Sequence, residues 1–401
     1  MGNPSVVLPT GLAISSSSIS GLMTESDPMI ALISEGRRDD VTIWSGLPAG
    51  LERGFRAMGI ATVRVSADLP LKSLRLAQMA MTPIYRDVHV AAVSRQLAIL
   101  RTRIVTHRLN SLQQVSGIVL IGANFTVNTQ LPLVTFQDLT VPLGRRQGRR
   151  HSGLKYKGGY EGLPRSVIDP WVQRQGQACR RARGCCVASR WAGESVHSDY
   201  GIERDKIHTV GIGANLKPRP SLRKQEIPRF LWVGKDWERK GGPAVLRAFA
   251  ALREEIPSAR LDIAGGHPRV SAPGVVTHGT FSLGDSEGRA RAISLFETAT
   301  VFVMPSRFEP YGIVHVEAGS AGVPSIGTTR GGACDSVGPG GLLVDPGDEV
   351  GLVAAMRRLS DPETARVFGE RALEHSKKNS WEAVADRVAG VLGPLRGVGP
   401  A

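Results

Sequence analysis

The sequence lacks an apolar run of about 18 residues, the shortest stretch that would indicate a membrane-spanning helix. It is also poor in cysteine: Cys179, Cys185, Cys186 and Cys334 form no C-x2-C pair and have no matching histidine spacing. We therefore expect free thiols in a reducing compartment and no metal site. Aromatic residues make up only 5% of the chain. None is interleaved with basic residues in a pattern typical of RNA binding, so nucleic acid is the least favoured partner.

Targeting signals are also missing from the first residues. They contain no basic segment followed by an apolar run, the pattern of a secretory signal. Val6 stands where a myristoylation signal has Ser or Thr. The sequence therefore predicts a cytoplasmic protein, and its content of Arg, Ala and Gly favours a bacterial source.

The length and composition indicate a globular protein with two domains. Hydrophobic residues make up 41% and charged residues 21% of the 401 residues. Residues 213–228 are rich in proline and polar residues, which predicts a linker between a first domain at 1–212 and a second at 229–380. We expect a hinge in this linker.

Apolar and amphipathic segments alternate in the first domain, as in a parallel, doubly wound α/β sheet. We expect a first strand at 5–8, a glycine- and serine-rich loop that contains Gly11, and a helix that starts at Asp27 and Pro28. Further strands are expected at 41–45, 62–66, 117–122 and 132–138, and helices at 47–58 and 71–114. Loops at the carboxyl ends of such strands face the ligand crevice, so Gly11, residues 122–124 and residues 137–138 are candidate site positions.

The positive charge is concentrated in the first domain. Residues 1–212 contain 26 Lys and Arg against 15 Asp and Glu, whereas the remainder contains 24 against 21. The densest run, at 145–165, also contains several glycines and is interpreted as a mobile basic loop. A solvated loop without a partner is the simplest interpretation. Contact with an anionic acceptor or an acidic lipid surface, and so peripheral membrane binding, is the next, followed by nucleic acid.

Two carboxylates separated by seven residues, Glu309 and Glu317, mark the most informative stretch, 305–324. An apolar strand precedes it, and Pro310 suits the first position of a helix that continues through Glu317. Helical geometry would place the two carboxylates at most about 12 Å apart and within about 80° of one another. The free N–H groups between them could hold a diphosphate. The alternative is that both are ordinary surface acids at a helix start.

The second domain opens with FLWVGKDWERKGG at 230–242, which is neither a P-loop nor a G-x-G-x-x-G fingerprint. Gly234 is followed by Lys235, Arg239 and Lys240 at a helix start, where cations are mildly unfavourable. Their presence there suggests an anionic ligand. Arg239 is expected to be solvated.

Residues 230–346 resemble the nucleotide-binding half of the retaining GT-B glycosyltransferases of family 4 (glycosyl transferases group 1, E-x7-E type). The resemblance is carried by the opening stretch at 230–242, ARLDIAGG at 259–266, EPYG and VEAGSAGVPSIGT at 309–327, and RGGACDSV and GLLVDPGD at 330–348. It implies two Rossmann-like domains that face a central cleft. It also implies a final segment, 381–401, whose helix crosses back to the first domain.

The resemblance also implies roles for single residues. Lys235 and Lys240 would grip the donor diphosphate, Glu309 would hold the sugar hydroxyls and Glu317 the ribose diol. The remaining donor-site positions are Gly234, Tyr311, Gly312 and Ile313, with Gly11 from the first domain. The family often has a histidine in a VxxHD pattern where this sequence has Gln137 followed by Asp138. Gln137 offers only neutral hydrogen bonds, and Asp138 could contact sugar or acceptor hydroxyls, act as a base, or simply cap a strand end.

The sequence thus predicts a retaining transferase that moves a hexose from a nucleoside-diphosphate sugar, UDP- or GDP-linked, to a hydroxyl of a small-molecule, lipid or glycan acceptor. It predicts no cofactor and no metal. Three alternatives stay open: a nucleotide-sugar epimerase of the same fold, which needs no acceptor; a phosphorylase, which needs phosphate; and a non-enzymatic basic protein that binds anions or nucleic acid with steep salt dependence.

Overall fold

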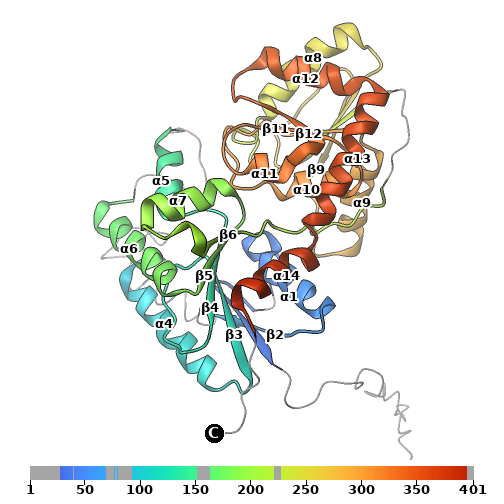
Figure 1. Ribbon diagram of the computed structural model, residues 1–401. Helices are drawn as coiled ribbons and strands as arrows, with labels where there is room; N and C mark the ends of the chain where they lie inside the picture. Colours follow the sequence, from blue (N-terminus) through green and yellow to red (C-terminus); the bar gives the residue numbers. More distant parts are fainter. Residues whose placement is uncertain are drawn as a thin grey trace, which may run out of the picture.

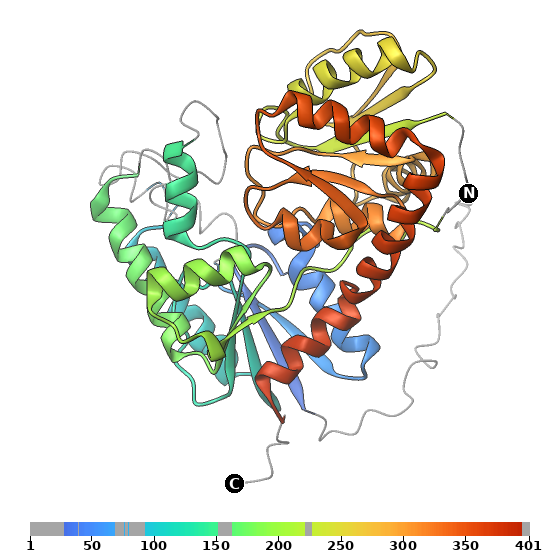
Figure 2. The ribbon, with the colours of Figure 1, turned by 45° about the horizontal axis from the view of Figure 1, so that its top comes forward.

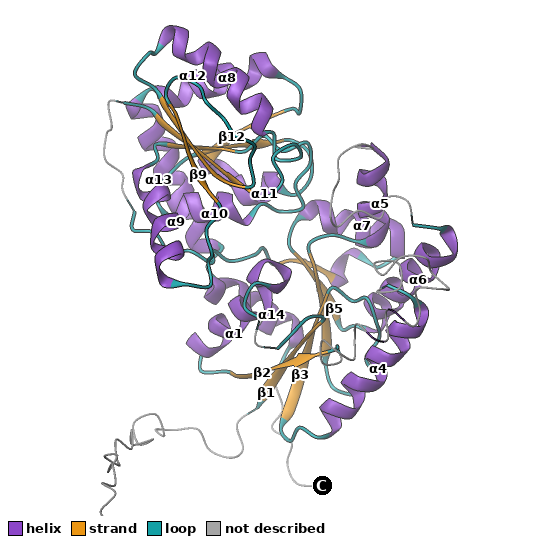
Figure 3. Cartoon of the chain, turned by 180° about the vertical axis from the view of Figure 1, so that it is seen from behind, coloured by secondary structure: helices purple, strands orange, loops and turns teal. Residues whose placement is uncertain are grey.

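The computed structural model describes residues 28–38, 40–68, 93–150, 163–220 and 227–394, together with Leu76 and Met79. These residues form two lobes, each built on a six-stranded sheet in which every strand pair is parallel (Figure 1). Helices cover both faces of each sheet (Figure 3). The predicted α/β architecture of two doubly wound domains is therefore confirmed.

The first lobe has the strand order β2-β1-β3-β4-β5-β6. Its order reverses at β1, so the loops after β1 and β3 flank a topological switch point, where ligands of such sheets bind. Its elements are β1 (Met29–Ser34), η1 (Ile43–Gly46), α1 (Leu47–Ala57), β2 (Ala61–Ser66), α4 (Arg95–Asn110), β3 (Val115–Ile121), β4 (Leu133–Gln137), α5 (Val141–Arg150), α6 (Arg165–Arg181), β5 (Gly184–Val187), α7 (Arg190–Tyr200), η2 (Arg204–Lys206) and β6 (Ile207–Thr209).

The start of the first lobe differs from the expectation. The helix expected from Asp27 and Pro28 is instead the central strand β1, whose residues are almost all buried. A central parallel strand is covered on both faces and shows a continuous apolar run without alternation, so its pattern resembles that of a buried helix. The strand expected at 41–45 is also wrong, because Ile43–Gly46 is a 3-10 turn in which Trp44 and Ser45 are left-handed. The expected strand 5–8 and Gly11 lie outside the described residues.

The basic segment 145–165 begins in a helix and not in a loop. Its first residues belong to α5, which places Arg145 and Arg146 on a helix. Arg146 pairs with Asp199 at 2.7 Å and Arg145 with Asp169 at 3.3 Å, so both arginines contact neighbouring helices. Residues 151–162 lie outside the described part of the chain. The loop interpretation is therefore corrected for 145–150.

The second lobe has the strand order β12-β11-β10-β7-β8-β9. Its switch point lies between β7 and β10, so the loop that carries Lys240 and the loop that carries Glu309 leave adjacent strands at the same edge. Its elements are β7 (Arg229–Gly234), α8 (Gly242–Glu255), β8 (Arg260–Gly265), β9 (Val275–Gly279), α9 (Ser286–Thr298), β10 (Val301–Val303), α10 (Ile313–Ser320), β11 (Ser325–Thr328), α11 (Ala333–Val337), η3 (Gly338–Gly340), β12 (Gly341–Val344), α12 (Glu349–Ser360), α13 (Pro362–Lys378) and α14 (Trp381–Leu392).

The last helix crosses from the second lobe to the first, as predicted (Figure 2). α13 packs in the second lobe, whereas α14 lies on α1 of the first. Trp381, at the start of α14, is buried in the same apolar cluster as Leu51 and Phe55. Gly50 and Gly54 of α1 make this contact possible, because a side chain at either position would overlap Trp381. Gly50 and Gly54 therefore allow α14 to pack on α1, and this packing joins the two lobes.

We expect Gly50→Ala to destabilise the protein although alanine favours a helix more than glycine does. The added methyl group would overlap the Trp381 ring, and overpacking of this kind costs about 1–3 kcal/mol. Gly390→Ala, in α14 with open space around its Cα, is the matched control and should be neutral or stabilising by up to about 1 kcal/mol. Urea unfolding of both variants measures the difference. Equal stability of the two variants would contradict the proposed contact.

Candidate active site

Glu309 lies at the centre of a buried charge cluster just after β10. Its Oε2 atom is 3.2 Å from Lys240 Nζ and 3.3 Å from Arg239 Nη1, and it accepts a hydrogen bond of 3.1 Å from Ser306 Oγ. The backbone of Glu309 is fixed as well, because its N–H donates to Arg330 O and its C=O accepts from the N–H of Gly332. Glu309 is thus held in one orientation from both sides.

The cluster keeps a buried carboxylate charged. Burial alone would raise the pKa of Glu309, but the nearby cations Lys240 and Arg239 outweigh it and lower this pKa to about 2. Burial lowers the pKa of Lys240, and the attraction of Glu309 opposes that shift. Arg239 also donates to Phe308 O at 3.0 Å. The expectation that Arg239 is solvated was wrong, since it is buried and holds Glu309 in place.

The helix after Glu309 begins later than predicted. α10 starts at Ile313 with Gly312 as its N-cap, so Pro310 precedes the helix. Gly312 has φ +83°, and a side chain there would lie 3.0 Å from Glu309 Cγ and 2.8 Å from the His315 ring. His315 is buried against Phe302. The free N–H groups at the start of α10 therefore lie beside the carboxylate of Glu309.

Tyr311 can serve a ligand only through its backbone. Its side chain is buried in the apolar cluster of the first lobe, together with Val210 and Ile212. Burial raises the pKa of the Tyr311 phenol. Ser336 Oγ donates to Tyr311 O at 2.5 Å. The side chain of Tyr311 thus ties the two lobes together beneath the start of α10.

Glu317, the second predicted carboxylate, is buried on α10. Its Oε1 atom accepts hydrogen bonds from the N–H groups of Asn215 at 3.2 Å and Leu216 at 3.3 Å, which belong to the linker between the lobes. Burial raises the pKa of Glu317 to about 7, despite these hydrogen bonds and the positive charge of Lys240. Among the described residues, its Oε2 atom accepts no hydrogen bond from a protein donor.

The residues between β7 and α8 bring the cations to this site. Gly234 ends β7, and a side chain there would lie 2.5 Å from Lys240 Cδ, so glycine leaves the space that the Lys240 side chain occupies. Lys240 Nζ also lies 3.2 Å from Met304 Sδ at the end of β10. Lys235 is exposed and forms no hydrogen bond through its amine within the described residues. Lys240 is therefore part of the built cluster, and Lys235 lies at its rim.

The first lobe contributes Asp138, which follows β4. Burial raises the pKa of Asp138, and the negative charge of Glu309 raises it further. Gln137 points away from this site: its Nε2 atom donates to Cys179 Sγ at 3.3 Å in the interior of the first lobe. The residue at the family's histidine position is therefore part of the core.

Contacts near Asp138 hold the two lobes together. Arg190, at the start of α7, uses its backbone N–H and its Nε atom to bind both oxygens of Asp335, each at 2.7 Å. Ser189 Oγ donates to Pro310 O at 3.4 Å. The loop after β5 thus contacts the loops that follow Glu309, and Asp335 has a structural role as the partner of Arg190.

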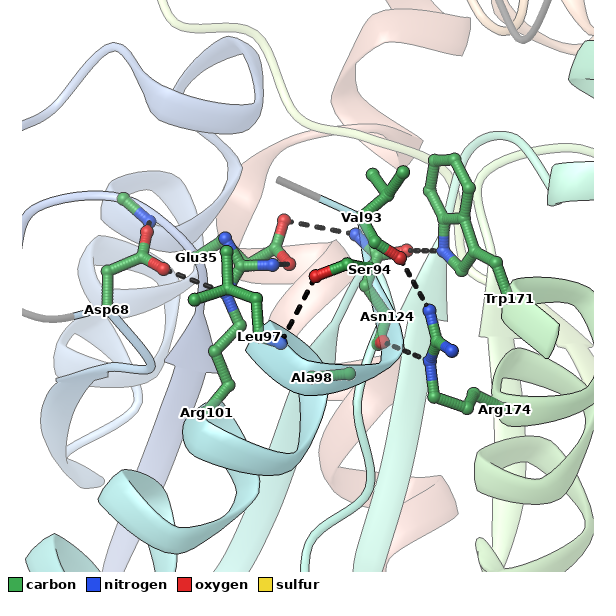
Figure 4. Close-up of polar contacts among 12 residues, drawn as sticks. Glu35, Asp68, Val93, Ser94, Leu97, Ala98, Arg101, Asn124, Trp171 and Arg174 are labelled. Atoms are coloured by element: carbon green, nitrogen blue, oxygen red, sulfur yellow. Dashed lines mark hydrogen bonds and ion pairs between the residues drawn. The ribbon is translucent and has the colours of Figure 1, made fainter. Parts of the chain in front are cut away.

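A second polar cluster lies at the switch point of the first sheet, after β1, β2 and β3 (Figure 4). Arg101 of α4 pairs with Glu35 at 2.6 Å and Asp68 at 2.8 Å. Asn124 Nδ2 donates to Glu35 at 3.1 Å, and Asn124 Oδ1 accepts from Trp171 Nε1 at 2.8 Å. Burial raises the pKa of Glu35, while Arg101 opposes that shift. The cluster rigidifies the edge of the first lobe that faces the second.

The described parts of the chain show neither a candidate metal cluster nor a candidate membrane span. No group of three or more His, Cys, Asp or Glu side chains there is arranged to hold a metal ion. No helix in those ranges combines the length and apolar character that crossing a membrane requires.

Comparison with known proteins identifies the second lobe. Residues 227–361 match the family model described as glycosyl transferases group 1. The chain contains a glycosyl transferases group 1 domain. This domain includes Gly234, Lys235, Lys240, Glu309 and Glu317, so the predicted donor residues of the second lobe lie within it.

Two curated sequence relatives each match about half of this chain. Sulfoquinovosyl transferase SQD2 of Arabidopsis thaliana is 29% identical over 202 residues, which cover 47% of this chain and 38% of that protein. D-inositol 3-phosphate glycosyltransferase of Thermobifida fusca is 28% identical over 214 residues, covering 47% and 49% respectively. The chain spans about half the length of the curated relatives it matches or less.

A solved structure shows the same fold over nearly the whole chain. Sucrose-phosphate synthase from Thermosynechococcus elongatus superposes with a TM-score of 0.60 at 19% identity, covering 90% of this chain and 97% of the other. The two lobes and the crossing helix α14 are thus the GT-B fold.

Sequence reasoning missed several residues that shape this site. Ser306 had a local signal, since it stands three residues before Glu309 in the same loop. Arg239 had an ambiguous one, because an arginine at a helix start is usually exposed. Asn215 had none, since its partners lie 74 or more residues away along the chain.

The buried Glu317 predicts an unusual dependence of stability on pH. Its pKa is about 7 in the folded protein and near 4.5 when unfolded, so between these values the folded state binds more protons and stability falls as pH rises. Glu317→Gln keeps an acceptor for the linker N–H groups and removes the charge. The variant should be more stable than the wild type at pH 8, by up to about 3 kcal/mol, and the difference should shrink towards pH 5.

Urea unfolding at pH 5 and pH 8 measures this difference. Glu254→Gln, which removes an exposed carboxylate on α8, is the control and should show no such pH dependence. A gain for Glu317→Gln that is the same at both pH values would contradict the pKa assigned to Glu317.

Proposed function

We propose that the protein is a retaining glycosyltransferase that uses a nucleoside-diphosphate hexose, UDP- or GDP-linked, and needs no metal for departure of the diphosphate. The observation that carries the proposal is the meeting of Lys240, Glu309 and the start of α10 at the switch point of the second sheet. A cation and free backbone N–H groups at one place suit a diphosphate. The group 1 domain supports the same class of reaction.

The donor would lie along the start of α10. Its diphosphate would take the N–H groups at residues 311–313 together with Lys240, and Lys235 would approach from the rim. Glu309 would accept hydrogen bonds from the sugar hydroxyls, because its lowered pKa keeps it ionised. Glu317 would hold the ribose diol through the oxygen that the linker amides leave open.

Catalysis would rest on charge that is in place before the reaction. The bond between the sugar C1 and the diphosphate oxygen breaks, and the acceptor oxygen attacks C1 from the same face, which retains the configuration. The leaving phosphate oxygen takes the acceptor proton, so no protein base is required. Lys240 and the α10 N–H groups would stabilise the negative charge on the phosphate, and one preorganised donor of this kind contributes roughly 3–4 kcal/mol.

The acceptor would approach from the first lobe. Asp138 follows β4, and its raised pKa would let it carry a proton and donate to, or accept from, a sugar or acceptor hydroxyl. The acceptor would be a small molecule, lipid or glycan, with an anionic group favoured by the charge of the first lobe. We place the protein in the cytoplasm, with peripheral contact to acidic membranes through residues 145–165.

Nucleotide binding tests the donor site directly. We expect one of UDP, GDP, dTDP and ADP to raise the melting temperature of the wild type, since a ligand at a hundred times its Kd stabilises by about 2.7 kcal/mol. Lys240→Met and Glu317→Ala should lose this response, whereas Lys377→Met, an exposed lysine on α13, should keep it. If no nucleotide stabilises the wild type, or if both site variants respond normally, the donor site is misplaced.

Product stereochemistry tests the reaction class. The donor for this test carries the nucleotide that binds in the previous experiment. Proton NMR of the first product should show that the sugar, whether transferred or released, keeps the anomeric configuration it has in the donor. Lys240→Met should lower kcat by about 100- to 1000-fold, because it removes one charge that stabilises the leaving phosphate. Addition of EDTA should leave the rate unchanged. An inverted first product, or conversion of the donor without any acceptor or water, would overturn the proposal.

A further inference from the structure

The linker between the lobes concentrates its polar contacts at one residue, Asn215. Its side chain faces the first lobe and the crossing helix. Nδ2 donates to Ser45 O at 2.7 Å, and Oδ1 accepts from Trp381 Nε1 at 3.3 Å and Arg53 Nη2 at 3.4 Å. These three partners come from η1, α14 and α1. The side chain of Asn215 thus joins three elements that lie against one another in the first lobe (Figure 2).

The backbone of Asn215 faces the second lobe. Its N–H donates to Glu317 Oε1, and the next N–H, that of Leu216, binds the same oxygen. Its carbonyl accepts from Arg289 Nη1 of α9 at 3.4 Å. Every polar group of Asn215 therefore has a partner, and these partners come from both lobes.

The surroundings fit an asparagine closely. Ser45, at φ +55°, adopts the left-handed conformation, and its carbonyl accepts from Nδ2. Gly46 has φ +82°, and a side chain there would lie 2.9 Å from Asn215 Nδ2. Gly213 leaves space for Trp381, since a side chain would come within 2.6 Å of its ring. A residue without both a donor and an acceptor at this length could not make the same set of contacts.

We propose that Asn215 is a positioning residue for the donor site: its side chain, anchored to Ser45 and Trp381, holds the linker amides that orient Glu317. This inference rests on the proposed role of Glu317 as the ribose ligand. Fixing Oε1 with two N–H groups turns Oε2 towards the ligand before the ligand arrives. By linkage, nucleotide binding at Glu317 and docking of α14 on the first lobe then stabilise one another.

The sharpest test changes a residue buried in the core of the first lobe. Trp381→Phe removes the indole N–H that holds Asn215 Oδ1 together with part of the buried ring, so its control must lose the same ring atoms. We expect it to weaken binding of the matching nucleoside diphosphate about two- to tenfold by calorimetry, the effect of one lost hydrogen bond. Trp171→Phe is the matched control, because Trp171 also donates a buried indole hydrogen bond, to Asn124, but has no connection to Asn215. It should bind the nucleotide like the wild type.

A second measurement needs no ligand. Hydrogen exchange of the Asn215 and Leu216 amides should be faster in Asn215→Ala and in Trp381→Phe than in the wild type, and unchanged in Trp171→Phe. In turnover with the donor, Asn215→Ala should raise the donor KM about tenfold and lower kcat much less, because the groups around the diphosphate stay in place.

The outcomes separate this inference from the proposed function. If the wild type binds a nucleotide and Trp381→Phe binds it equally well with unchanged amide exchange, the coupling through Asn215 is wrong and the donor site stands. If the wild type binds no nucleoside diphosphate, the donor site fails and the inference fails with it. Equal weakening by Trp381→Phe and Trp171→Phe would assign the effect to general destabilisation and overturn the specific role.

Discussion

The ionised carboxylate of Glu309 is the constraint on which the second lobe is organised. An unpaired charge in that position would be prohibitively costly, so Lys240 and Arg239 must reach it from the loop after β7. The pairing of β7 with β10 brings the two loops together, and Gly234 leaves the space beside β7 that the Lys240 side chain occupies. The same arrangement keeps a lysine close to the N–H groups at the start of α10.

The two acids of the E-x7-E stretch have opposite electrostatic environments. Glu309 has two cations beside it and a lowered pKa, whereas Glu317 has mainly neutral N–H donors and a raised one. The difference follows from position, since Glu309 precedes the helix and meets the loop after β7, while Glu317 lies within α10 against the linker. Glu309 is thus held by two cations, whereas Glu317 is held by the amides of the linker that joins the lobes.

Much of the second lobe could be predicted because its signals are local. Its apolar pattern predicts strands at 230–233, 259–264 and 275–279 and a helix at 243–256. Strand β9 occupies the residues expected, and β7, β8 and α8 begin or end within a residue or two of these bounds. The first lobe was harder: β1 is a buried apolar run that follows a helix-like start signal, and α5 is a glycine- and arginine-rich segment. α5 is held by tertiary contacts, including the pair Arg146–Asp199 and the hydrogen bond from the Val141 N–H to Gln175. Neither contact is visible in a local window.

Contacts across long sequence separations set the limit for the site as well. Lys240 and Glu309 lie in two separate loops, and a known motif is enough to assign both to one site. Nothing in the sequence distinguishes Arg239 from a solvated arginine until Glu309 is placed beside it. The linker shows the same limit more strongly, because Asn215 joins Ser45, Glu317 and Trp381, which are distant from it and from each other in sequence. The GT-B fold brings them together, since the crossing helix returns to α1 at the point where the linker passes. The geometry of the Glu317 carboxylate is therefore a property of both lobes, although Glu317 lies in the second.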